Sequence, residues 1–165
     1  MEADLIQNAL AYAARHELQL AERLGFGVHG MIFVAEDKSK GGKIAVKAHY
    51  ESEPYLRERA VYERLEAAGV TEVLGFNVPQ FIGAEDDLRV FAMTIVTRPF
   101  VLDFAGAYLD APPDFPDELW AEWEAGKREL FEERWPKVEK ILGALREWDI
   151  YMVDVSPSNI AFAAD

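Results

Sequence analysis

Apolar residues recur at helical spacing in three stretches of the chain, and each stretch predicts an amphipathic helix. In residues 2–17 the apolar side consists of Leu5, Ile6, Ala9, Leu10 and Ala13. In residues 52–65, where Pro54 suits the first helical turn, it consists of Leu56, Ala60, Val61 and Leu65. The third stretch, residues 117–148, is rich in aromatic residues, and its apolar positions are Leu119, Trp120, Trp123, Leu130, Phe131, Val138, Ile141, Leu142 and Leu145. Pro136 is expected to kink or split this helix, because an interior proline loses a backbone hydrogen bond and clashes with the preceding turn.

Other segments carry apolar, β-branched runs that predict strands. Residues 31–36 and 44–47 are two of these runs, and residues 78–84 and 88–96 predict a hairpin around the acidic turn 85–87. With the segment that leads into Gly25, these runs predict a five-stranded sheet. Residues 101–109 predict a short helix, and the proline-rich residues 111–116 predict a linker. The mixture of helices and strands predicts an α+β fold.

The composition narrows the class of protein. With 165 residues and 50% hydrophobic content, the chain is expected to form one compact unit that buries roughly 70% of its unfolded surface. The net charge of −13 argues against a nucleic-acid partner, whose phosphates would be repelled. We expect a cytoplasmic protein without a membrane span or signal peptide, since the first helix is too short and too charged for either. The chain has no cysteine, and His16, His29 and His49 are too scattered along it for a zinc site.

A glycine-rich segment provides the first candidate site. Gly25, Gly27 and Gly30 have the spacing G-x-G-x-x-G, which by itself is a weak signal. Dinucleotide-binding turns with this spacing lead into a helix, whereas here an apolar, β-branched run follows. The segment therefore predicts a hairpin that covers phosphates.

The glycines and the strand after them resemble a known family. Gly25, Gly27, Gly30 and Ile32, followed by the Ile-Ala-Val-Lys run 44–47, are similar to the G-x-G-x-x-G-x-V and V-A-I-K motifs of the protein-kinase-like family. That family includes small-molecule kinases such as the aminoglycoside and choline phosphotransferases. The resemblance implies a protein-kinase-like fold, with a five-stranded antiparallel N-lobe and its helix in residues 1–96. A hinge and a reduced helical C-lobe would follow in residues 97–165.

The resemblance also implies an ATP site around Lys47. Lys47 would bind the phosphates and pair with a helix glutamate, for which Glu58 fits the family spacing better than Glu63. The alternative is that both glutamates belong to a solvated, arginine-rich helix face. We expect a Lys47→Ala variant to lose ATP binding and to keep its fold.

Further nucleotide contacts are implied on either side of Lys47. Ile32 and Ala45 would contact the nucleotide. Met93 would lie behind the adenine, and the backbone of Thr94 to Val96 would hydrogen-bond it. An ordinary core methionine is the other reading of Met93.

The segment 154–159 reads D-x-x-x-x-N between two short apolar runs, as in the catalytic loop of the family. By resemblance, Asp154 would orient the acceptor hydroxyl or accept its proton, and Asn159 would help to hold Mg²⁺ on the phosphates. Ser156 stands where the family usually has a lysine or histidine, so one positive charge is missing near the transferred phosphoryl group.

The largest departure from the family is that the chain contains no D-F-G, whose aspartate is the main magnesium ligand. Six residues follow Asn159, and Asp165 is too close to take that role. Either the protein ends before this ligand, or the sequence is part of a longer chain. Two functions therefore remain open: an ATP-dependent phosphotransferase acting on a protein or small-molecule hydroxyl, and an inactive pseudokinase-like nucleotide-binding or protein-interaction module. For the second, the aromatic-rich residues 117–148 are a candidate partner surface, with core packing as the alternative.

Overall fold

The computed structural model describes residues 1–96 and 101–162. The first residue of the expected hinge, residue 97, and Asp165 lie outside these ranges. The N-terminal half contains, in order, α1 (Glu2–Arg15), β1 (Leu18–Phe26), β2 (Gly30–Asp37), β3 (Lys43–His49), α2 (Ser52–Ala67), β4 (Glu72–Val73), β5 (Phe76–Asn77), β6 (Phe81–Glu85) and β7 (Val90–Thr94). The remaining elements are β8 (Val101–Leu102), β9 (Tyr108–Leu109), α3 (Asp117–Phe131), a 3₁₀ turn (Glu132–Arg134), α4 (Trp135–Leu145), a second 3₁₀ turn (Arg146–Trp148), β10 (Ile150–Tyr151) and β11 (Ile160–Ala161).

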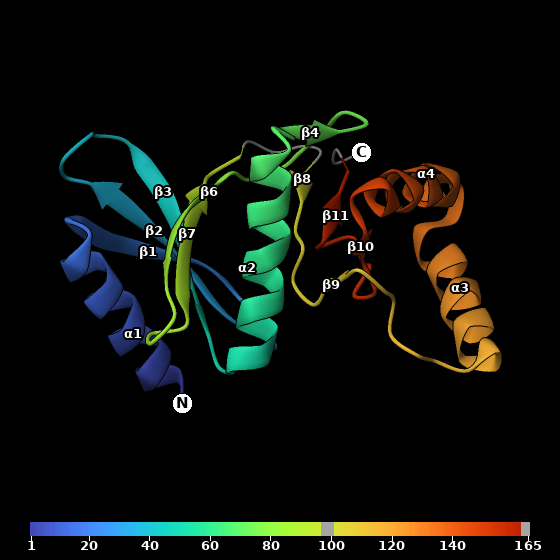
Figure 1. The fold of residues 1–165 in the computed structure, drawn as a ribbon, viewed down its shortest axis with the longest axis horizontal. Helices are drawn as coiled ribbons and strands as arrows, with labels where there is room; N and C mark the ends of the chain where they lie inside the picture. Colours follow the sequence, from blue (N-terminus) through green and yellow to red (C-terminus); the bar gives the residue numbers. More distant parts are fainter. Residues whose placement is uncertain (97–100, 163–165) are drawn as a thin grey trace.

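The predicted five-stranded sheet is confirmed, and its order is β1-β2-β3-β7-β6 with antiparallel pairing throughout. Helix α1 packs on one face of this sheet and α2 on the other (Figure 1). Side chains on a strand alternate between the two faces. In β3, Val46 and Ala48 therefore join the α1 core, while Ala45 joins the α2 core. By the same alternation Lys47 and His49 face α2, which places two polar side chains under a helix.

The helices α1 and α2 form as predicted, but the apolar stripes are partly wrong. In α1, Ile6 and Leu10 are exposed, and Tyr12 is buried in their place. Residues 5, 9, 12 and 13 share the narrow stripe that meets the sheet, whereas 6 and 10 are rotated away from it. In α2, Leu56 is exposed, and the stripe is made of Tyr55, Glu58, Val61, Tyr62 and Leu65. A buried glutamate in an otherwise apolar stripe is the first indication of a functional site.

The expected helix at residues 101–109 is wrong. Val101 and Leu102 form β8, which pairs with β11 on one side and with β5 on the other. Tyr108 and Leu109 form β9, which pairs with β10. Gly106 between them has a φ of +75°, a conformation that helices exclude. Pairing with distant strands thus overrides the local helical pattern.

The long helix predicted for residues 117–148 is split, as Pro136 indicated. The break falls at Glu132, which has a φ of +53°, and Pro136 lies in the first turn of α4, where proline is tolerated. Helix α4 buries Val138, Ile141, Leu142 and Leu145, whereas Phe131 is the buried residue of α3. Leu119 and Leu130 were expected on the apolar face, but both are exposed.

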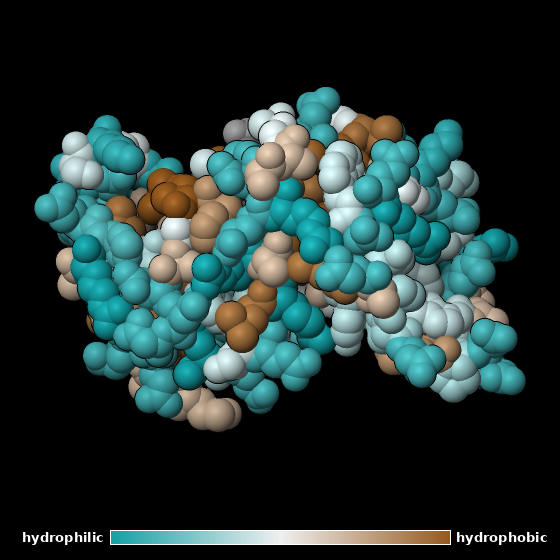
Figure 2. Space-filling model, viewed as in Figure 1, coloured by the Kyte–Doolittle hydropathy of each residue, from teal (hydrophilic) through white to brown (hydrophobic). Residues whose placement is uncertain are grey.

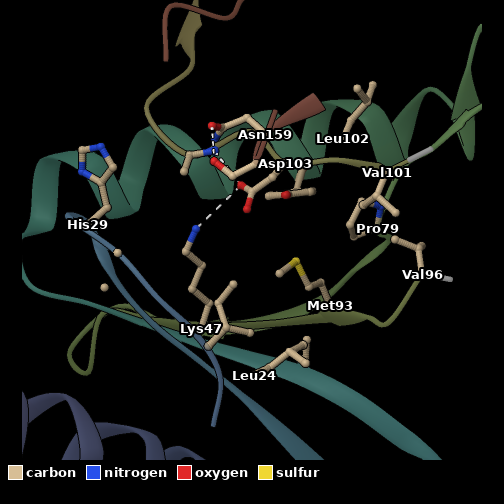
Figure 3. A pocket seen from close by; sticks show the side chains of 18 of the residues that line it. Leu24, His29, Lys47, Pro79, Met93, Val96, Val101, Leu102, Asp103 and Asn159 are labelled. Carbon is tan, nitrogen blue, oxygen red and sulfur yellow. Dashed lines mark hydrogen bonds and ion pairs between the residues drawn. The ribbon is translucent and has the colours of Figure 1, made fainter. Parts of the chain in front are cut away.

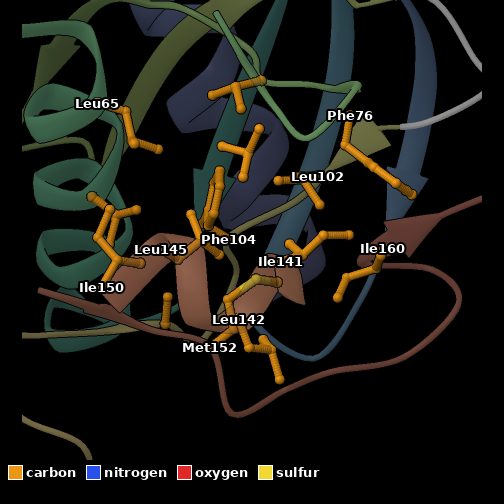
Figure 4. Close-up of a cluster of buried hydrophobic side chains, with 14 of the residues drawn as sticks. Leu65, Phe76, Leu102, Phe104, Ile141, Leu142, Leu145, Ile150, Met152 and Ile160 are labelled. Carbon is orange, nitrogen blue, oxygen red and sulfur yellow. The ribbon is translucent and has the colours of Figure 1, made fainter. Parts of the chain in front are cut away.

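The larger hydrophobic core lies between α2, α4 and the short strands. Figure 4 shows Leu65, Leu102, Ile141, Leu145 and Ile160 converging from these elements. On the face of the molecule that Figure 2 shows, the surface is mostly hydrophilic. Within the described residues, no helix combines the length and apolar character needed to span a membrane.

Candidate functional site

A pocket of about 700 Å³ lies where the β1–β2 hairpin, β3 and the end of β7 face the segments around β8 and β11 (Figure 3). The predicted site residues that line it are Gly25, Gly27, Gly30, Ile32, Ala45, Lys47, Met93, Thr94, Val96, Asp154 and Asn159. Glu58 lies behind this lining, against Lys47. Motifs that are far apart along the chain therefore form the walls of one cavity.

Lys47 and Glu58 form a buried ion pair at the base of the pocket. The ammonium Nζ lies 2.7 Å from Glu58 Oε1, and the two residues are 4% and 1% exposed. Glu63, the alternative partner, pairs with Arg59 instead. Burial alone would raise the pKa of Glu58, but the Lys47 ammonium and the His49 ring outweigh it and lower this pKa to about 2. Glu58 is therefore charged at neutral pH and holds Lys47 in place.

His49 is a part of this cluster that the sequence reasoning missed. Its ring is fully buried, and Nε2 lies 3.5 Å from Glu58 Oε2. The Nδ1 atom lies 3.4 Å from the backbone carbonyl of Arg89, and the rings of Tyr55 and Phe91 enclose the imidazole. The signal was available, because His49 is two residues after Lys47 and so shares its face of β3.

The glycines of the hairpin serve different purposes. A Cβ added to Gly30 would lie 2.0 Å from the carbonyl oxygen of Ala48, so the close approach of β2 to β3 requires glycine there. A Cβ at Gly27 would meet nothing within 4 Å, and one at Gly25 only the end of Ile32 at 4.0 Å. Both have ordinary backbone conformations, so the fold does not require glycine at either position. Their bare backbone instead leaves space on the side of the pocket.

Asp103 is the second functional candidate that the sequence reasoning missed. Its Oδ1 lies 3.9 Å from Lys47 Nζ, and its backbone N–H donates to the Asn159 carbonyl at 2.8 Å. This bond continues the pairing of β8 with β11, so two chain segments that are distant in sequence meet in the pocket. The available signal was the sequence Asp-Phe-Ala-Gly at 103–106, directly after the apolar pair 101–102. This signal was overlooked for two reasons. The segment was expected to be helical, and it lies before the D-x-x-x-x-N loop, whereas the family has its metal-binding aspartate after that loop.

The loop that carries Asp154 and Asn159 is held by its own hydroxyl groups. Ser156 Oγ donates to Asn159 Oδ1 at 2.6 Å, and Ser158 Oγ lies 2.7 Å from Ser156 Oγ. Trp123 of α3 donates its indole N–H to the Val153 carbonyl at 3.0 Å. Together with Lys47, the carboxylates of Asp103 and Asp154 make this wall of the pocket strongly polar. Burial lowers the pKa of Lys47, but the carboxylate of Glu58, and after it those of Asp103 and Asp154, outweigh burial and raise this pKa.

The opposite end of the pocket is apolar. Met93 is 6% exposed and belongs to the α2 core, which confirms the core reading of this residue. It also lines the cavity, and its contact with an adenine stays a prediction. The N–H of Thr94 donates to the Gln80 carbonyl at 2.9 Å, and the Thr94 hydroxyl accepts the N–H of Gln80 at 2.8 Å. A flat ligand at this edge would therefore rely on backbone groups after Thr94, toward Val96.

The aromatic-rich residues 117–148 contribute a smaller pocket of about 360 Å³. Trp120, Trp123 and Trp135 line it together with Glu124 and Glu139. The three rings pack edge to face in sequence, and Trp135 belongs to the main core. Core packing therefore accounts for part of this aromatic content, and a partner surface on α3 stays a prediction.

The carboxylates and the amide of the pocket are the candidate ligands for a metal ion. Among residues 1–96 and 101–162, no group of three or more histidine, cysteine, aspartate or glutamate side chains is placed to hold a metal ion. Magnesium on a phosphate ligand commonly uses only one or two protein carboxylates, and the Asp103 carboxylate and the Asn159 amide provide oxygen donors of that kind.

No family model, curated protein or solved structure matches this chain.

Proposed function

We propose that this protein is a kinase-like phosphotransferase that binds ATP in the 700 Å³ pocket and transfers the γ-phosphoryl group to a hydroxyl acceptor. The observation that supports this most strongly is the Lys47–Glu58 pair. Burying two charges costs free energy that their mutual attraction rarely offsets in full. A functional role therefore explains such a pair better than a contribution to folding stability does. It lies beneath glycines that the fold does not require and opposite two carboxylates.

Each polar group has a defined part in this proposal. Lys47 offsets the charge of the phosphates, and Glu58 holds its ammonium toward the pocket. The apolar end between Ala45 and Met93 receives the base. Asp103 and Asn159 would hold Mg²⁺, which neutralises phosphate charge when bound. Binding of this kind accelerates transfer mainly by positioning and by electrostatic stabilisation.

In the transfer step, Asp154 acts on the acceptor hydroxyl. The acceptor oxygen attacks the γ-phosphorus, the bond from that phosphorus to the β,γ-bridging oxygen breaks, and ADP leaves. The hydroxyl proton passes to the Asp154 carboxylate. The acceptor itself, a protein or small-molecule hydroxyl, depends on surfaces outside the pocket.

A catalytically inactive nucleotide-binding module is the second candidate. The observation that favours it is Ser156, which stands where the kinase-like family usually has a lysine or histidine. Its hydroxyl donates a hydrogen bond to Asn159 Oδ1 at 2.6 Å. The transferred phosphoryl group would then lack one of its usual charge partners.

The two candidates differ in a turnover assay. ATP labelled on the γ-phosphate is incubated with the protein, Mg²⁺ and a panel of protein and amino-alcohol acceptors, and ADP and labelled product are followed. We expect transfer by the parent, loss of transfer in Asp154→Asn with ATP affinity nearly unchanged, and normal transfer in the matched surface variant Asp114→Asn. ATP binding without turnover would favour the inactive module, and equal transfer by the parent and Asp154→Asn would remove Asp154 from the mechanism.

A further inference from the structure

The charges around the pocket are unbalanced for a triphosphate. Among the described residues that line it, the permanently charged side chains are Lys47, Asp103 and Asp154. One cation therefore faces two carboxylates, and Glu58 already compensates that cation at 2.7 Å. A triphosphate carries several negative charges and is bound most strongly by charge-assisted hydrogen bonds. Bound Mg²⁺, as proposed above, would offset part of this charge, and a further donor at the phosphate end would offset more of it.

His29, at the tip of the glycine hairpin, is the other basic side chain among the described residues that line the pocket, and its ring N–H can donate to a phosphate. Figure 3 places it at one end of the pocket and Val96 at the other, with Lys47 and Asp103 between them. If the base lies toward Val96, the chain of phosphates runs past Lys47 toward His29. The terminal phosphate is then the group nearest the imidazole.

A backbone hydrogen bond holds the hairpin tip in this position, and the imidazole lies beside Gly106. Its backbone carbonyl accepts the N–H of Tyr50 at 3.1 Å, which ties the hairpin tip to the end of β3. A Cβ added to Gly106 would lie 3.5 Å from His29 Nε2 and 3.4 Å from Asp154 Cβ. The imidazole thus reaches across the pocket to the segment that also borders the acceptor aspartate. Its neighbour Val28, in contrast, is 90% exposed.

We infer that His29 binds the terminal phosphate of the nucleotide and supplies the basic side chain that Ser156 does not. This inference rests on the proposed function of the same pocket. It makes His29 a substrate contact that discriminates ATP from ADP and AMP, since only ATP extends a third phosphate to the hairpin tip.

The test measures the affinities of AMP, ADP and ATP by calorimetry for the parent, His29→Ala and His29→Arg. We expect His29→Ala to weaken ATP by about tenfold, the loss of one charge-assisted hydrogen bond, and AMP and ADP by less than about twofold. His29→Arg should retain the preference for ATP, because a basic side chain with hydrogen-bond donors remains. The matched control is His16→Ala, on an exposed histidine that pairs with Glu85 outside the pocket lining.

The outcomes separate this inference from the proposal beneath it. Equal losses for all three nucleotides in His29→Ala, unchanged ATP affinity, or a loss that arginine does not reverse would overturn the role of His29 alone. Absence of binding of every nucleotide to the parent would overturn the proposed function and this inference together. Thermal unfolding is recorded for each variant first, and His29→Gln replaces His29→Ala if the alanine variant is unfolded.

Discussion

Removal of the Lys47 ammonium should destabilise the fold strongly, contrary to the expectation from sequence. Lys47 and Glu58 are 4% and 1% exposed, so a Lys47→Met variant leaves a buried carboxylate without its main partner. Breaking a buried pair in this way costs about 3–5 kcal/mol. For a chain of this size, that loss corresponds to a fall in the unfolding midpoint of roughly 6–20 °C.

The matched variants identify the charge as the cause. Lys47→Met/Glu58→Gln removes both charges at similar volume and should recover most of the lost stability, because no unpaired ion remains. Lys43→Met, at the exposed start of β3, should change the free energy of unfolding by no more than about 0.5 kcal/mol. Urea unfolding of the four proteins measures these differences. A loss below about 1 kcal/mol in Lys47→Met, or a double variant as unstable as the single one, would refute the reasoning.

Acid adds a second readout of the same pair. The folded-state pKa of Glu58, about 2, is below its ordinary value of 4.5. The stabilisation from this group is therefore fully present above about pH 4.5 and declines as the pH falls toward 2, by about 3 kcal/mol in total. The parent should lose more stability across this range than Lys47→Met/Glu58→Gln, by about that amount. Parallel pH profiles would show that Glu58 is not the titrating group.

Four further substitutions test separate parts of the structure. Gly30→Ala should lower the free energy of unfolding, measured in urea, by about 1–3 kcal/mol, because the added Cβ meets a backbone carbonyl of β3. Gly27→Ala should leave this stability unchanged and weaken only nucleotide binding. Equal stability of the two variants would contradict the close approach at Gly30. Asp103→Asn should reduce the gain in ATP affinity that Mg²⁺ produces, measured by calorimetry with and without the ion, and an unchanged gain would exclude Asp103 as a ligand. Trp123→Phe should cost about 1 kcal/mol in thermal unfolding through loss of the indole bond to the Val153 carbonyl, and an unchanged midpoint would show that this bond is not significant.

The sequence predicted the parts of the fold that depend on local periodicity. The strands from 31–36 to 88–96 and the helices around Pro54 and Pro136 follow from patterns within a few residues of each other. The face on which a residue lies was also accessible, because alternation along β3 puts Lys47 opposite the helix that holds Glu58. These local rules were enough to assemble most of the pocket lining.

The missed features depend on contacts between distant segments. Val101 and Leu102 become a strand because β11 and β5 lie on either side of them, and no local pattern contains that information. Asp103 enters the pocket only as a result of this pairing. The exposure of Leu119 and Leu130 likewise depends on which side of α3 meets the core, and helical spacing alone does not determine that side. Sequence patterns therefore located the motifs, whereas tertiary pairing decided which other residues join them.

The measurement that tests the central proposal most directly is calorimetric titration of ATP into the parent protein, with and without Mg²⁺, beside Lys47→Met/Glu58→Gln. The double variant is chosen because it removes the cation that is proposed to bind the phosphates and leaves neither member of the buried pair charged. We predict one ATP per chain in the parent, tighter binding with Mg²⁺, and loss of most of this affinity in a double variant that remains folded. Equal ATP affinity in both proteins, or no binding to the folded parent, would contradict a nucleotide site built around Lys47.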